Sequence, residues 1–144
     1  MNRSSIYLFS ALLLLISYSC KKEFAPEEAI LGNWKLTELE SDYLGPMIDV
    51  YPFLQPCFTD NILMFFPDNT FIMDEGETKC TETANQIYEQ GDWIFQDNAK
   101  IIKYGIYEVE ILEFTETRLK STYQLVDTTL NKTSTFIQTF TKVQ

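Results

Sequence analysis

The chain of 144 residues contains no histidine. This absence excludes catalytic triads of the Ser-His-Asp type, Cys-His nucleophile pairs and zinc sites of the HExxH type. The sequence also has no G-x-x-x-x-G-K-[ST] phosphate-binding loop and no G-x-G-x-x-G segment. We therefore predict that the protein is not an enzyme and that it needs no cofactor.

Paired carboxylates are the catalytic alternative that these absences leave open. Glu108 and Glu110 alternate with apolar residues along one segment, so we expect both side chains in solvent. Glu113 falls on the apolar side of the same alternation. It is a buried acid, a polar anchor for a ligand, or the end of a strand.

Basic residues are few: 11 Lys and Arg stand against 21 Asp and Glu, and the formal net charge at pH 7 is −10. Such a surface repels phosphates and anionic lipid headgroups, which argues against binding of nucleic acid. The charge is explained by solubility alone, and it is also compatible with a basic protein partner or a cationic ligand. Glycine and proline are equally scarce, with five of each, whereas aromatic residues make up 15%. This composition is typical of a folded domain and not of a disordered chain.

Long apolar runs are absent except at the N-terminus. Arg3 precedes an apolar run at residues 6–16, and the small and polar residues 17–19 follow it. The pattern predicts a secretory signal peptide, since the run is shorter than the roughly 20 residues of a membrane span. Cys20 comes directly after Ser19 and resembles the lipidated cysteine of a bacterial lipobox.

The lipobox resemblance implies a domain organisation and a cellular location. Residues 1–19 would be a lipoprotein signal peptide, residues 20–28 a tether, and residues 29–144 the folded domain. The mature protein would be anchored by lipid on Cys20 in the bacterial cell envelope, in the outer membrane, on its periplasmic or its surface face. An ordinary signal peptide that is cut elsewhere is the alternative.

Cysteine is also scarce, with three residues. If Cys20 carries lipid, Cys57 and Cys80 remain as one pair in an oxidising compartment. We predict a disulfide between them. A metal site and a reactive thiol are the alternatives, and two cysteines without histidine are a poor set of metal ligands, so we predict no metal.

From residue 31 onward, the apolar runs have the length of strands and are separated by turn residues. Eight strands are predicted, at residues 31–39, 61–66, 70–74, 90–96, 100–104, 107–114, 118–126 and 132–143. A helical turn is predicted at residues 27–31, and loops at residues 41–56 and 75–89. Because the connections are short, the strands should be antiparallel. We expect them to close into an all-β, up-and-down barrel of eight strands, with a flattened sandwich as the alternative.

The alternation of residues predicts which side chains point into this barrel. The candidates for lining a ligand are Phe65, Phe71, Trp93, Phe95, Val109, Ile111 and Tyr123. An eight-stranded barrel is either filled by its own side chains or holds one small ligand, and the sequence leaves both open.

Gly32-Asn33-Trp34 on the first predicted strand resembles the G-x-W element of the lipocalins. In that family the tryptophan closes the barrel floor beneath a basic residue from a late strand, which implies a cation–π contact from Arg118 to Trp34. The order of Trp34, Cys57, Asp68-Asn69-Thr70-Phe71 and Cys80 resembles the lipocalin-like lipoproteins of Bacteroidetes. A second lipocalin motif of the T-D-Y type is missing.

The resemblance implies a lipid-anchored extracytoplasmic binding protein for a small hydrophobic ligand. The alternatives are a protein-interaction module, such as an inhibitor of a secreted protease or lysozyme, and a structural subunit of the envelope. Asp127-Thr128-Thr129 also resembles the O-glycosylation site of Bacteroidetes envelope proteins, which makes Thr128 a candidate for modification.

Overall fold

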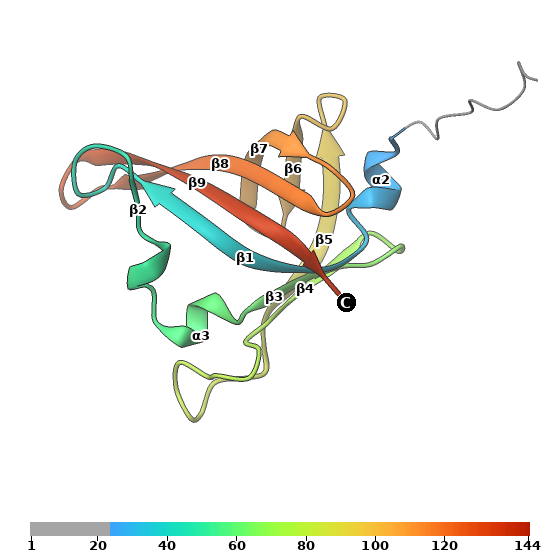
Figure 1. The fold of residues 1–144 in the computed structure, drawn as a ribbon, viewed down its shortest axis with the longest axis horizontal. Coiled ribbons are helices and arrows are strands. Elements are labelled where there is room, and N and C mark those ends of the chain that lie inside the picture. Colours follow the sequence, from blue (N-terminus) through green and yellow to red (C-terminus); the bar gives the residue numbers. More distant parts are fainter. Residues whose placement is uncertain (1–23) are drawn as a thin grey trace, which may run out of the picture.

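The computed structural model describes residues 24–144. The predicted signal peptide and the lipid anchor on Cys20 lie outside the described residues. The strands, shown in Figure 1, are β1 (Gly32–Ser41), β2 (Ile48–Asp49), β3 (Ile62–Phe65), β4 (Thr70–Asp74), β5 (Ile87–Gln96), β6 (Ile101–Tyr104), β7 (Tyr107–Phe114), β8 (Arg118–Asp127) and β9 (Lys132–Val143).

The strands form a closed, antiparallel barrel. Neighbours along the chain pair with one another from β3 to β9, β1 pairs with β3, and a pairing of β1 with β9 closes the circle. The predicted barrel of eight strands is confirmed. The two-residue strand β2 lies outside the circle, because it pairs only with the end of β1, within the segment that was predicted as a loop. Strand β5 begins at Ile87, three residues earlier than predicted.

Three short helical segments accompany the barrel: α2 (Pro26–Ala29), the 3-10 turn η1 (Tyr51–Phe53) and α3 (Pro56–Thr59). Each has a proline in its first turn, where the missing N–H costs no helical hydrogen bond. The start of α2 falls inside the segment predicted as a tether. Within residues 24–144, no helix is long and apolar enough to cross a membrane.

Because successive strands run in opposite directions, the turns divide between two ends of the barrel. The floor end holds α2, the C-terminus and the turns after β3, β5 and β7. The open end holds η1, α3 and the turns after β4, β6 and β8. The core fills the barrel with buried aromatic and aliphatic side chains, among them Trp34, Phe65, Phe71, Trp93 and Ile102.

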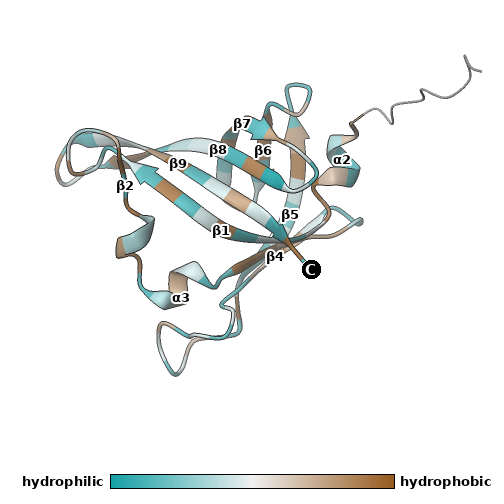
Figure 2. Cartoon of the chain, viewed as in Figure 1, coloured by the Kyte–Doolittle hydropathy of each residue, from teal (hydrophilic) through white to brown (hydrophobic). Residues whose placement is uncertain are grey.

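The register shifts at three places, in β1, between β4 and β5, and in β7, and the β-bulges in β1 and β7 decide where the carboxylates of these two strands point. One lies in β1 between Leu36 and Glu38, and the other in β7 between Ile111 and Glu113. A bulge inserts one extra residue, so the alternation is shifted by one beyond it. Trp34 and Leu36 therefore share the inner face with Leu39 and not with Glu38. Figure 2 shows the alternation of hydrophilic and hydrophobic residues along β1 and β8.

Candidate ligand-binding site

A cavity of about 230 Å³ lies inside the barrel, toward the open end. Leu54 and Phe58, from the segment that holds η1 and α3, contribute to its wall beside residues of the strands. Nine of the lining side chains are aliphatic or phenylalanine: Leu36, Leu39, Leu54, Phe58, Ile62, Leu63, Met73, Val109 and Phe140. The remaining lining side chains are four tyrosines and two amides: Tyr88, Tyr104, Tyr107, Tyr123, Asn61 and Gln138.

A short chain of hydrogen bonds lies in the buried wall of this cavity. The Gln138 amide nitrogen donates to Ser121 Oγ at 3.1 Å and makes a longer contact with the Tyr104 hydroxyl at 3.5 Å. Ser121, Tyr104 and Gln138 are all buried. These bonds offset the cost of placing polar groups inside the barrel.

The four tyrosines are neutral groups at physiological pH. Burial, with a smaller contribution from the nearby carboxylates of Glu89 and Glu75, raises the pKa of Tyr88 to about 12. Burial also raises the pKa values of Tyr104, Tyr107 and Tyr123. Each phenol therefore keeps its proton and is able to donate a hydrogen bond.

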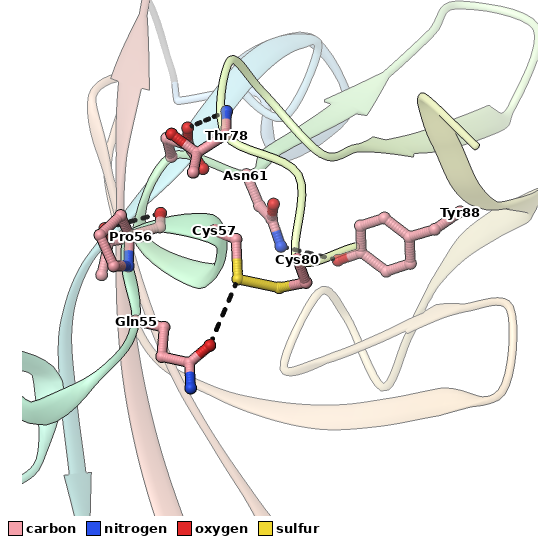
Figure 3. The surroundings of a disulfide bond; sticks show 9 residues. Gln55, Pro56, Cys57, Asn61, Thr78, Cys80 and Tyr88 are labelled. Atoms are coloured by element: carbon pink, nitrogen blue, oxygen red, sulfur yellow. Dashed lines mark hydrogen bonds between the residues drawn. A yellow bond between two sulfur atoms is a disulfide. The ribbon is translucent and has the colours of Figure 1, made fainter. Parts of the chain in front are cut away.

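The predicted disulfide between Cys57 and Cys80 is confirmed. It joins Cys57 in α3 to Cys80 in the loop between β4 and β5 (Figure 3). Cys57 is the chain neighbour of Phe58, which lines the cavity. In the same region the side chains of Asn61 and Tyr88, which both line the cavity, are hydrogen-bonded at 3.4 Å. Both thiols are used, so the metal and free-thiol alternatives for this pair are wrong. Nowhere in residues 24–144 do three or more His, Cys, Asp or Glu side chains form a possible metal site.

Of the seven predicted lining residues, Val109 and Tyr123 line the cavity. The other five are core residues that do not line it. Phe65, Phe71 and Trp93 are buried, and Phe95 and Ile111 pack against the same core. The physical reason is that the barrel is filled toward its floor by ring-on-ring contacts, such as Phe65 with Trp93 and Trp93 with Phe95. They leave space only toward the open end.

Sequence reasoning missed Tyr88, Tyr104, Tyr107 and Gln138 as lining residues. Tyr107 has the same position in the alternation of β7 as Val109, which was an available signal. Tyr88 was hidden because β5 begins inside the segment that was predicted as a loop. A glutamine on an apolar strand face gives no signal of its own.

The floor of the barrel is closed by Trp34, which is fully buried. Its indole Nε1 donates to the Ile30 carbonyl at 2.6 Å. The ammonium group of Lys142 lies 5.3 Å from the centre of the Trp34 ring and donates to the Ala29 carbonyl at 2.8 Å. Gly32 has a φ of +113°, and a side chain there would meet the Lys142 stem at 3.1 Å, so glycine suits both the backbone and the space.

The cation over Trp34 is therefore Lys142 and not Arg118, which corrects the prediction. Lys142 is the register partner of Trp34 across β1 and β9, and directly opposed side chains share a face of the sheet. Arg118 pairs with Thr141, which pairs with Lys35, so Arg118 lies on the outer face.

On that outer face, Arg118 joins two carboxylates. It forms ion pairs with Glu38 of β1 at 3.0 Å and with Glu113 of β7 at 3.6 Å. The hydrogen bonds from Arg118 and Thr139 lower the pKa of Glu38. Glu113 is thus neither a buried acid nor a ligand anchor.

The model of the family described as "Lipocalin-like domain" matches residues 30–121. The chain belongs to the lipocalin-like domain family. No curated protein matches the sequence.

Solved structures similar to this lipocalin-like domain include two of bovine odorant-binding protein. The complex with undecanal has 16% sequence identity and a TM-score of 0.48, over 88% of this chain and 78% of that chain. The protein from bovine nasal mucosa has 14% identity and a TM-score of 0.48, over 86% of this chain and 77% of that chain. At this level the likeness concerns the fold alone.

Proposed function

We propose that this lipocalin-like domain binds one small hydrophobic molecule in the cavity and catalyses no reaction. The observation that carries the proposal is the cavity of about 230 Å³ with nine apolar side chains in its wall. A concave site with an apolar wall and a few polar groups is typical of ligand binding. Since an apolar cavity of about 150 Å³ holds benzene, this one has room for a ligand of about nine or ten non-hydrogen atoms.

Naphthalene has a suitable size and no polar group, and we expect it to bind the wild-type domain. Leu39→Trp should weaken this binding at least tenfold, because Leu39 lines the cavity and the indole would occupy its volume. Fluorescence titration of naphthalene measures the affinity, and thermal unfolding shows that the variant is folded.

Leu125→Trp is the matched control, because Leu125 is 53% exposed and does not line the cavity. Its affinity for naphthalene should stay within about twofold of the wild-type value. A wild-type domain that does not bind naphthalene, or a folded Leu39→Trp variant that binds it normally, would contradict the proposal.

We propose further that the mature protein is a lipoprotein of the bacterial envelope, in the outer membrane, with Cys20 as the lipidated residue. The support is the sequence pattern of residues 3–20 and the cysteine that follows Ser19. Two additional features agree with an oxidising compartment: the disulfide Cys57–Cys80 and the lack of any other cysteine in residues 24–144.

Cys20→Ala is expected to abolish lipid labelling and to move the protein from the detergent phase to the aqueous phase. The reason is that thioether attachment of the lipid needs the Cys20 thiol, and no other anchor is proposed. Labelling with a palmitate analogue in a bacterial host measures this. Cys80→Ser, in the described domain, is the control and should leave labelling unchanged; persistent labelling of Cys20→Ala would exclude this anchor.

A protein-interaction module is the second candidate, and one observation favours it. Several large apolar side chains are exposed on the segments at the open end, among them Leu44 (78%), Phe53 (81%) and Leu130 (62%). Exposed apolar side chains at one end of a domain are typical of a docking surface. The Leu39→Trp variant separates the two candidates, because a filled cavity would leave binding through this surface intact.

A further inference from the structure

We propose that the cavity selects its ligand by the charge of the head group: it accepts a neutral molecule with a hydroxyl group, held by Gln138 and the tyrosines, and it rejects the anion of a fatty acid. This inference rests on the proposed function, since it names the ligand class of the same cavity.

The first argument is the lack of a counter-charge. None of the fifteen lining residues is Lys, Arg, Asp or Glu. A carboxylate that entered the cavity would lose its hydration and would gain no cationic partner, which is strongly unfavourable. An ammonium group would also lose its hydration. Glu75 and Glu89 attract it from beside the cavity, but no carboxylate of the wall itself pairs with it.

The second argument is the negative charge beside the cavity. Glu75 is 9% exposed, and its Oε2 atom is buried without a hydrogen-bond partner in the described part of the chain. The charges of Glu75 and Glu89 both act on Tyr88, and Glu89 also acts on Tyr107. Two cavity-lining tyrosines therefore lie in the field of carboxylates, which repels an anionic head group.

The third argument is the hydrogen-bonding capacity that the wall leaves unused. Both contacts of the Gln138 side chain are made by its amide nitrogen, so its amide oxygen accepts no hydrogen bond from residues 24–144. Tyr104 accepts a contact from Gln138, which leaves its own proton available. The Tyr123 hydroxyl has no hydrogen-bond partner among the described residues.

These free groups match a hydroxyl. A hydroxyl both donates and accepts, so it can donate to the Gln138 amide oxygen and accept from a tyrosine. A carboxylate only accepts, and it would leave the Gln138 oxygen without a partner. An ammonium group only donates, and it would leave the tyrosine protons without one.

The test uses three probes with the same eight-carbon chain: octan-1-ol, octanoate and octylamine. Isothermal titration at pH 7.5 should give an affinity for octan-1-ol at least tenfold higher than the affinities for octanoate and octylamine. Equal or tighter binding of either charged probe would overturn the inference. If naphthalene binds and octan-1-ol does not, the inference is overturned and the proposed function stands. If naphthalene does not bind either, the proposed function itself is wrong.

Tyr123→Phe tests the hydroxyl contact on a folded protein, because the hydroxyl that it removes has no partner among residues 24–144. We expect it to weaken octan-1-ol binding about three- to tenfold and to leave naphthalene binding unchanged. Tyr43→Phe is the matched control, since Tyr43 is exposed and lies outside the cavity wall. If both Tyr123→Phe and Gln138→Leu retain the wild-type affinity for octan-1-ol, the assigned head-group site is wrong.

Discussion

Replacing Trp34 by alanine is expected to lower the free energy of unfolding by about 3–5 kcal/mol, the usual loss for a large aromatic side chain in a core. Trp34 is 0% exposed, and its ring contacts both the Phe114 ring and the ammonium group of Lys142. The substitution removes this packing, and it also leaves the Ile30 carbonyl without the indole hydrogen bond. Urea denaturation of residues 24–144, followed by circular dichroism, measures the change.

Trp34→Phe is the control that separates packing from hydrogen bonding. Phenylalanine keeps most of the buried ring and removes the Nε1 donor, so the expected loss is about 1–2 kcal/mol. The variants should therefore rank wild type, Trp34→Phe, Trp34→Ala in decreasing stability. A loss near zero for Trp34→Ala would show that the floor of the barrel does not depend on this residue.

The strand order was predictable because it depends on local patterns. The strand at residues 107–114, for example, alternates over its first five residues, and short turns at residues 105–106 and 115–117 separate it from its neighbours. The disulfide was predictable as well, because the predicted lipidation of Cys20 left Cys57 and Cys80 as the remaining pair of cysteines. These features need no knowledge of how distant segments pack.

The outer-face network around Arg118 was not predictable, because two bulges create it. The alternation that starts at Trp34 and Leu36 would place Glu38 inside the barrel, and the alternation of Val109 and Ile111 would do the same for Glu113. The bulges after Leu36 and Ile111 turn both carboxylates outward, where each meets Arg118. A bulge is a mismatch between two paired strands, and a single strand's sequence carries little sign of it.

The sequence left open whether the barrel contains a cavity, and the reason is a different one. Whether a barrel of this size is filled depends on how far its rings reach and on what covers its open end. Here the rings near Trp93 fill the lower part, whereas Leu54 on the predicted loop and Phe58 just after that loop contribute to the cavity wall. The crosslink at Cys57 joins α3 to the loop after β4, and the residue pattern of a single strand does not show where such segments lie.

The crosslink itself is therefore expected to matter for stability. The double substitution Cys57→Ser and Cys80→Ser should lower the free energy of unfolding by about 3 kcal/mol, the entropic value for a loop of about two dozen residues. The two cysteines are 23 residues apart, and they join α3 to the loop between β4 and β5. Without the bond, the unfolded chain gains freedom that the folded barrel does not.

Reductant provides the matched control, because it opens the same bond without a change of sequence. Urea denaturation of the wild type should move to the stability of the double variant when a thiol reductant is present, whereas the variant itself should not respond. Since Cys57 is the neighbour of the cavity-lining Phe58, the variant should also bind naphthalene more weakly than the wild type. Equal stability of the oxidised wild type and the variant would mean that α3 and the loop after β4 hold their places by packing alone.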